Sequence, residues 1–267
     1  MEPTNIAFAF GLTLFAGLAT GIGSALAFFT KQTNVKFLSV ALGFAAGVMI
    51  YVSFMEIVTK GQESLISILN EREGTFWTIV AFFGGMLLIG IIDRLVPTIG
   101  NPHTVYKVED LDETHKKSGL ARMGILTAIA IAIHNFPEGF ATFTAAVYDL
   151  RLGIPIAIAI AIHNIPEGIA VSIPVYYGTG DKKKAFFYSF LSGLSEPLGG
   201  LVAFLLLGRF FNELAFGLTF GLVAGIMVFI SFDQLLPTSG KYGEHHFSIY
   251  GLVAGMMVMA ASLLLFI

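Results

Sequence analysis

The segment AIAIAIHNFPEGFA at residues 128–141 recurs almost unchanged as AIAIAIHNIPEGIA at residues 157–170. Each copy places a His-Asn-x-Pro-Glu-Gly motif in the middle of a long, otherwise apolar run. An apolar run of about 20 residues is long enough to cross the hydrocarbon core of a bilayer. The two copies therefore predict a pair of neighbouring membrane helices that both carry polar side chains at mid-span.

The whole chain has the composition of a membrane protein. Of its 267 residues, 55% are hydrophobic and only 12% are charged, whereas soluble domains carry about 25% charged residues. The apolar runs predict an all-α integral membrane protein, one transmembrane domain over residues 1–267, with a polar loop at 93–121. The eight expected spans are residues 6–29, 37–58, 76–92, 122–148, 153–177, 185–207, 214–236 and 248–267.

The positions of the lysines and arginines predict the orientation of these spans. Eleven of the fifteen fall on the side of the bilayer that holds the 93–121 loop, and the richer side is normally cytoplasmic. Both termini are then outside, in a multi-pass protein of the cell (plasma or inner) membrane. The first residues lack a positively charged leader, so the first apolar run is expected to be a permanent helix.

Charge and cysteine content exclude several classes of function. The net charge of −3 gives no basic surface for nucleic acid. The chain has no cysteine, which rules out disulfides and thiolate ligands for soft metals.

Two further internal repeats relate distant parts of the chain. GVMIYVSF at residues 47–54 recurs as GIMVFISF at 225–232, and GLATGIGSALAF at 17–28 matches GLSEPLGGLVAF at 193–204. In the expected topology, the two members of each pair cross the membrane in opposite directions. This is the signature of inverted repeats, in which spans 1–3 mirror spans 6–8 around a central pair, spans 4 and 5. Such symmetry suits alternating access.

The two repeated motifs supply six candidate metal ligands near mid-membrane. An ionised carboxylate there costs about 2.5–3.5 kcal/mol or more, and a divalent cation is the simplest counter-charge. His and Glu at i and i+4 share a helix face, and Asn and Glu at i and i+3 nearly do. Buried histidines that only tie helices together are the alternative, which two identical motifs make less attractive. The six are His134, Asn135, Glu138, His163, Asn164 and Glu167.

The small and cyclic residues of the motifs add to this prediction. Pro137 and Pro166 remove amide donors and are expected to free backbone carbonyls and kink the helices at the site. Gly139 and Gly168 are expected to let the two motif helices approach closely. Interrupted helices at a repeat interface are where transporters bind their substrates.

Glu196 is the candidate ligand from a third helix. It breaks the repeat, since the aligned residue in the first span is Thr20; a protonated carboxyl bonded to a neighbour is the alternative. Imidazole, carboxylate and amide together suit Zn²⁺, Fe²⁺, Mn²⁺ or Co²⁺ and disfavour Ca²⁺ and Cu⁺. The set is large enough for two adjacent metals bridged by Glu138 and Glu167, and no prosthetic group is expected.

The remaining polar residues have less specific interpretations. Glu56 is either an entrance ligand or an interfacial charge. For Asp93 and Asp233, capping or interface roles are favoured over an exit path. Four histidines are expected to be solvated in loops: His103, His115, His245 and His246.

The motifs HNFPEG (134–139), HNIPEG (163–168) and SGLSEPLGG (192–200) resemble those of the ZIP (Zrt-/Irt-like) divalent metal transporters, most of all the ZupT-type zinc transporters. The resemblance covers essentially the whole chain. It implies eight helices in a 3-2-3 arrangement with both termini outside. It also implies import into the cytoplasm of zinc, with iron, manganese, cobalt and cadmium as further substrates.

The same resemblance implies a binuclear centre. One position would use His134, Glu138, His163 and Glu167, and the other Asn135, Glu138, Asn164, Glu167 and Glu196. Many members have a histidine-rich loop after the third helix, whereas this loop holds only two histidines. The partners are then metal ions and the lipid bilayer, and whether two copies form a homodimer stays open.

Two other classes of function fit the residues less well. A membrane enzyme with a di-metal site would use Glu-x-x-His on its helices, but this chain has His-x-x-x-Glu, and it lacks the H-E-x-x-H of zinc proteases. A purely structural or receptor-type membrane protein leaves the buried carboxylates and inverted repeats unexplained. A transporter, and not an enzyme, is therefore expected.

Overall fold

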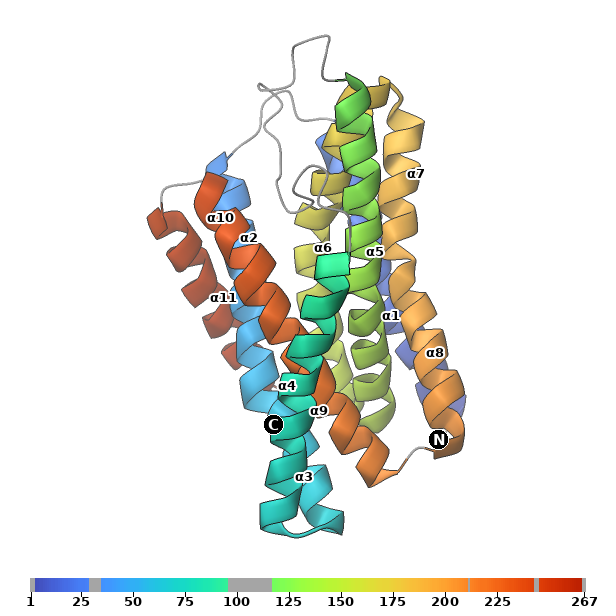
Figure 1. Ribbon diagram of the computed structural model, residues 1–267, viewed down its shortest axis with the longest axis vertical. Coiled ribbons are helices and arrows are strands. Elements are labelled where there is room, and N and C mark those ends of the chain that lie inside the picture. Colours follow the sequence, from blue (N-terminus) through green and yellow to red (C-terminus); the bar gives the residue numbers. More distant parts are fainter. Residues whose placement is uncertain (1–2, 29–34, 96–116, 211, 243–244, 266–267) are drawn as a thin grey trace.

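The computed structural model describes residues 3–28, 35–95, 117–210, 212–242 and 245–265, and these form helices and short turns without any strand (Figure 1). Seven stretches of this part are long and apolar enough to cross a membrane. The one predicted span outside these seven is the fourth, residues 122–148, which falls on α5 (Lys117–Tyr148) and lies within the bundle beside α6 (Leu150–Thr179). The prediction of an all-α, multi-span membrane protein is confirmed.

The other helices follow the predicted spans, with extensions. They are α1 (Pro3–Ala27), α2 (Val35–Val52), η1 (Ser53–Ile57), α3 (Val58–Ile68), α4 (Glu71–Leu95), α7 (Lys182–Gly193), α8 (Ser195–Phe210), α9 (Glu213–Ile230), η3 (Ser231–Leu235), α10 (Leu236–Tyr242) and α11 (His245–Leu265). The second and seventh spans continue further than predicted, as α3 and α10. Helix also occupies both ends of the expected 93–121 loop, whose residues 96–116 lie outside the described part.

Two short π-helical segments interrupt the α-helices at repeat-related positions. SFMEI forms η1 and SFDQL forms η3, and each begins at the next-to-last residue, a serine, of the GVMIYVSF or GIMVFISF repeat. A π-helical turn inserts extra backbone into a helix and is frequent at functional sites. Its occurrence in both copies shows that the two repeats share backbone geometry as well as sequence.

The helix contacts are paired as the repeats require. α1 packs on α6 as α8 packs on α5, and α2 packs on α11 as α9 packs on α4. Helices α1 and α8 run in opposite directions (Figure 1). A Cβ added at Gly23 would overlap with the carbonyl oxygen of Ile165, and one added at the repeat-related Gly199 would overlap with that of Phe136. Glycine is therefore needed at both positions, because a backbone carbonyl lies where a side chain would begin.

The bundle has an apolar interior and an apolar exterior. Its largest buried cluster joins α2, α6 and α9 through residues such as Met49, Ile160 and Met227. Helices α4 and α11 expose large apolar side chains, among them Leu87 at 67% and Leu264 at 72%. A soluble monomer does not expose apolar patches of this extent, so these faces fit contact with lipid.

Candidate metal site

The repeated motifs lie on α5 and α6, two neighbouring helices at the centre of the bundle (Figure 1). Glu196 lies in the first turn of α8, which packs against α5. The described side chains of the predicted ligands are buried, with Glu138 and Glu196 fully enclosed and Glu167 only 6% exposed. Three carboxyl groups are thus held away from water, which is unfavourable unless each is hydrogen-bonded or paired with a positive charge.

A histidine of α6 is paired with a glutamate of α5. The Nε2 atom of His163 lies 3.1 Å from Oε2 of Glu138, and both side chains are fully buried. The imidazole N–H donates and the carboxylate accepts. Both atoms are of the kind that binds zinc, so the contact puts two predicted ligands from different helices within reach of one ion.

A second contact between the same helices runs in the opposite sense. With the amide of Asn135 oriented so that its nitrogen faces acceptors, Nδ2 donates to Oε2 of Glu167 at 3.1 Å and to the carbonyl of Ile131 at 3.1 Å. The carboxylate of each motif thus accepts a hydrogen bond from a side chain of the other motif helix.

Asn164 links the site to two further helices. Its Nδ2 donates to the carbonyl of Ala16 on α1 at 2.9 Å and to Oε1 of Glu196 on α8. Its Oδ1 atom is buried and has no hydrogen-bond partner among the described residues. A buried amide oxygen of this kind fits a divalent cation as ligand. The carbonyl of Ala16 was not among the predicted site groups, because no sequence signal marks a backbone acceptor.

The motif glycines serve contacts other than the predicted one. A Cβ at Gly139 would overlap with the backbone of Glu196 on α8, and one at Gly168 would overlap with the carbonyl of Thr20 on α1. The prediction that they bring the two motif helices together is therefore wrong. Gly139 instead lets α5 approach α8 at Glu196, and Gly168 lets α6 approach α1 at the repeat-related Thr20. Gly139 therefore helps to position the third carboxylate.

A break in helical structure lies in the sixth span, and the predicted kinks at Pro137 and Pro166 stay predictions. Helices α5 and α6 continue through Pro137 and Pro166, whereas the sixth span is divided at Leu194, between α7 and α8. Pro197 follows within the first turn of α8, where a missing amide donor costs little. The interrupted helix is thus the one that carries Glu196.

His134 lies on α5, but its side chain is outside the described part of the structure. Among the described residues, no group of three His, Asp or Glu side chains is gathered tightly enough to hold a metal ion. The candidate ligands whose side chains are described are instead hydrogen-bonded to one another in pairs. The ligand roles of all seven predicted residues therefore stay predictions.

The remaining polar candidates are spread over the bundle. Glu56 lies in η1 and Asp233 is exposed in η3, while Asp93 is half-buried near the end of α4. The expectation that His245 and His246 are loop residues is wrong, because α11 begins at His245; the side chain of His246 is exposed there. His103 and His115 lie outside the described residues.

Comparison with known proteins gives consistent matches. The sequence model of a family described as ZIP zinc transporter matches residues 102–263. A protein of Oceanobacillus iheyensis named zinc transporter ZupT is 61% identical over 264 residues, which cover 98% of each chain. Proteins of the same name from Nitratidesulfovibrio vulgaris and Clostridium perfringens are 58% and 57% identical and cover 100% and 98% of this chain, and 100% and 97% of their own.

Proposed function

The chain belongs to the ZIP zinc transporter family, and we propose from this and from its geometry that it moves divalent transition-metal ions, zinc first, across a membrane. The ions bind between α5, α6 and α8. The named relatives are zinc transporters, and the long apolar helices place this chain in a bilayer. Movement of an ion through the bundle, rather than catalysis, is the proposed activity.

The observation that carries the proposal is the set of buried hydrogen bonds between motif residues. Glu138 accepts from His163, and Glu196 accepts from Asn164. A zinc or iron ion takes the carboxylate oxygens and the imidazole nitrogen as its own ligands. Entry of the ion replaces these hydrogen bonds, so the buried groups have partners both with and without the substrate.

Two ions can share this set of ligands. In the proposed binuclear site, the carboxylates of Glu138 and Glu167 bridge a histidine-rich position and an asparagine-rich position. His134 and His163 serve the first, and Asn135, Asn164 and Glu196 the second. Nitrogen and oxygen donors without thiolate bind several divalent first-row metals. We therefore extend the proposed substrates to iron, manganese, cobalt and cadmium.

The proposed direction is import, through a plasma or inner membrane with both termini outside. The chain has no cysteine, so single cysteines report the orientation directly. Asn70 lies in the exposed turn before α4, on the proposed outer side, and Lys183 is exposed at the start of α7, on the proposed inner side. A membrane-impermeant maleimide should label Asn70→Cys in intact cells and Lys183→Cys only after lysis.

Zinc uptake into proteoliposomes tests the proposed function. Radioactive zinc is supplied to wild type and to Glu138→Ala/Glu167→Ala, with iron, manganese, cobalt and cadmium as competitors. The wild type should take up zinc and the double variant should not, because both bridging carboxylates are gone. Glu63→Ala is the matched control, since this glutamate is exposed on α3 and forms an ion pair with a surface lysine, Lys60.

The elution volume and helicity of each variant show whether it is folded. Uptake that the double variant retains would place the transport site elsewhere. A wild type that binds metal but takes up none would instead support a membrane enzyme or a sensor.

A further inference from the structure

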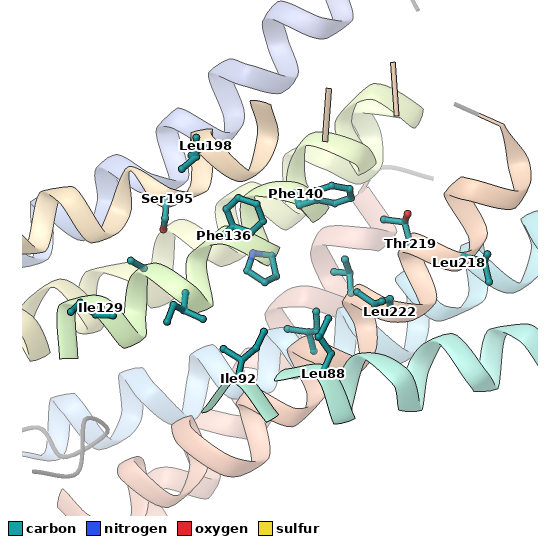
Figure 2. Close-up of a pocket in the computed structure, with 15 residues that line it drawn as sticks. Leu88, Ile92, Ile129, Phe136, Phe140, Ser195, Leu198, Leu218, Thr219 and Leu222 are labelled. Atoms are coloured by element: carbon teal, nitrogen blue, oxygen red, sulfur yellow. The ribbon is translucent and has the colours of Figure 1, made fainter. Parts of the chain in front are cut away.

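An apolar groove of about 750 Å³ lies between the helices that carry the site and the helices beside them. Figure 2 shows Phe136 and Phe140 of α5 on one side, facing Leu88 and Ile92 of α4 and Leu222 of α9 on the other. A groove of this volume is as large as the pockets that bind small molecules.

The lining of the groove fits hydrocarbon and not an ion. Thirteen of its fifteen lining residues are apolar, and Ser195 and Thr219 are the exceptions. The hydroxyl of Ser195 is already bonded to the carbonyl of Ser192 at 2.6 Å. Water in such a groove would find few partners, and filling it with apolar groups is favourable.

The groove opens to the outside of the bundle, within the membrane-spanning part. Its lining residues Leu88, Ile129 and Leu198 are 43%, 48% and 52% exposed. Leu88 and Leu198 lie inside stretches that are long and apolar enough to span a bilayer. The medium that meets this opening is therefore lipid hydrocarbon.

Comparison of the two repeats shows why the groove is present. In one half of the bundle, α6 packs against both α2 and α11. In the other half, α5 packs against α9, but α4, the counterpart of α11, makes little contact with α5 among the described residues. The groove occupies the space between α4 and α5 that this difference leaves.

We propose that this groove is a binding site for one acyl chain of a membrane lipid. The apolar lining, the opening toward the bilayer and the volume all fit a hydrocarbon chain, and the surrounding membrane supplies such chains at high concentration. The inference goes beyond metal transport and does not depend on it. A second copy of the protein or an empty groove are the other possible states, and the experiment separates them.

The position of the groove connects the lipid to the metal site. Phe136 and Pro137, which line it, lie between Asn135 and Glu138 in the first motif. Ser195, the first residue of α8, directly precedes Glu196. A bound acyl chain thus contacts residues that are adjacent in sequence to the candidate ligands. It can stabilise one arrangement of α5 relative to α4 and α9.

Photocrosslinking in reconstituted full-length protein tests the proposal. The probe is a phosphatidylcholine with a diazirine in one acyl chain, present as a tracer in phosphatidylethanolamine and phosphatidylglycerol vesicles. Crosslinked positions are mapped by peptide mass spectrometry. The expected crosslinks are at groove residues, in particular Phe140 and Leu222.

Neighbouring leucines of α4 provide a matched pair of variants. Leu88 lines the groove, while Leu87 is more exposed and is not part of its lining. Leu88→Trp should narrow the groove beside Phe140 and Leu222 and lower crosslinking at these two residues several-fold, and Leu87→Trp should leave it unchanged. Leu222→Trp narrows the same space from α9 and is the second test if Leu88→Trp does not fold.

Equal crosslinking in the Leu88→Trp and Leu87→Trp proteins would overturn the proposal. So would labelling that simply follows exposure around the bundle, without enrichment in the groove. A photoreactive benzophenone side chain placed at Phe140 that crosslinks to a second protein chain would also overturn it and assign the groove to an interface. None of these readouts requires zinc uptake, so they stand or fall separately from the transport function.

Discussion

Gly139→Ala should damage the site through packing alone, without removing any polar group. A Cβ at this position would overlap with the backbone of Glu196, including its carbonyl oxygen and Cα. Backbone atoms cannot rotate aside as a flexible side chain can. Helix α8 must therefore move away from α5 by about 1.5–2 Å to restore normal contact distances of roughly 3.5–4 Å.

Two effects of this displacement can be estimated. Overpacking of a tight interface costs about 1–3 kcal/mol, and the overlap with backbone favours the upper part of that range. A shift of about 1 Å at a binding group can lower the rate of a reaction by roughly 100-fold. We therefore expect Gly139→Ala to lower both the thermal stability and the zinc uptake rate, because Glu196 moves with α8.

Gly84→Ala is the matched control for the same substitution in another membrane helix. A Cβ added at Gly84 of α4 meets no atom within 4 Å. Alanine favours the helix over glycine by about 0.5–1 kcal/mol, so this variant should be as stable as the wild type or slightly more so. Thermal unfolding in detergent and zinc uptake are measured for both variants. Equal midpoints and equal uptake in the two would refute the assigned role of Gly139.

Three further substitutions test single groups. Glu138→Gln keeps an acceptor for His163 but removes the charge. Zinc affinity measured by calorimetry should then fall by more than the roughly 10–100-fold that is typical when a residue supporting a metal ligand is replaced. Unchanged affinity would argue against a ligand role. Asn164→Ala removes hydrogen bonds to α1 and α8, which should cost about 1–3 kcal/mol of stability and alter the order of competing metals in uptake assays. Asn212→Ala removes the side-chain cap at the start of α9 and should cost about 1 kcal/mol in thermal unfolding, with normal zinc uptake per folded molecule.

Hydropathy predicted the membrane helices well and their ends poorly. The helix of the second span does not stop near Val58 but continues as α3 to Ile68. This segment holds Lys60 and Glu63, which form an exposed ion pair. Charged residues end an apolar run, but they do not end a helix, since backbone hydrogen bonds continue into the polar region. Hydropathy therefore marks where the apolar run stops and misses the helical extension.

The candidate ligands could be chosen from the sequence, but their pairing could not. Identical motifs and helical spacing indicated which residues share a face. They do not give the rotation of one helix about its axis relative to another, so the contact of Asn164 with Ala16 and Glu196 was not foreseen. For the same reason, Gly139 was correctly expected at a close helix contact but assigned to the wrong neighbour. A small residue in a membrane helix indicates a close contact with another helix, but it does not identify that helix.

Around the site, the departure from internal symmetry lies on one helix pair. The two central motifs are nearly identical, and their glycines contact repeat-related residues, Thr20 in one case and Glu196 in the other. Yet α1 is continuous at Thr20, whereas its counterpart is divided into α7 and α8 just before Glu196. The two repeated motifs supply equivalent carboxylates, Glu138 and Glu167. Glu196, at the position that aligns with Thr20, adds a third carboxylate on one side only. In the proposed site, an ion would therefore meet a carboxylate toward α8 and a hydroxyl-bearing residue, Thr20, toward α1.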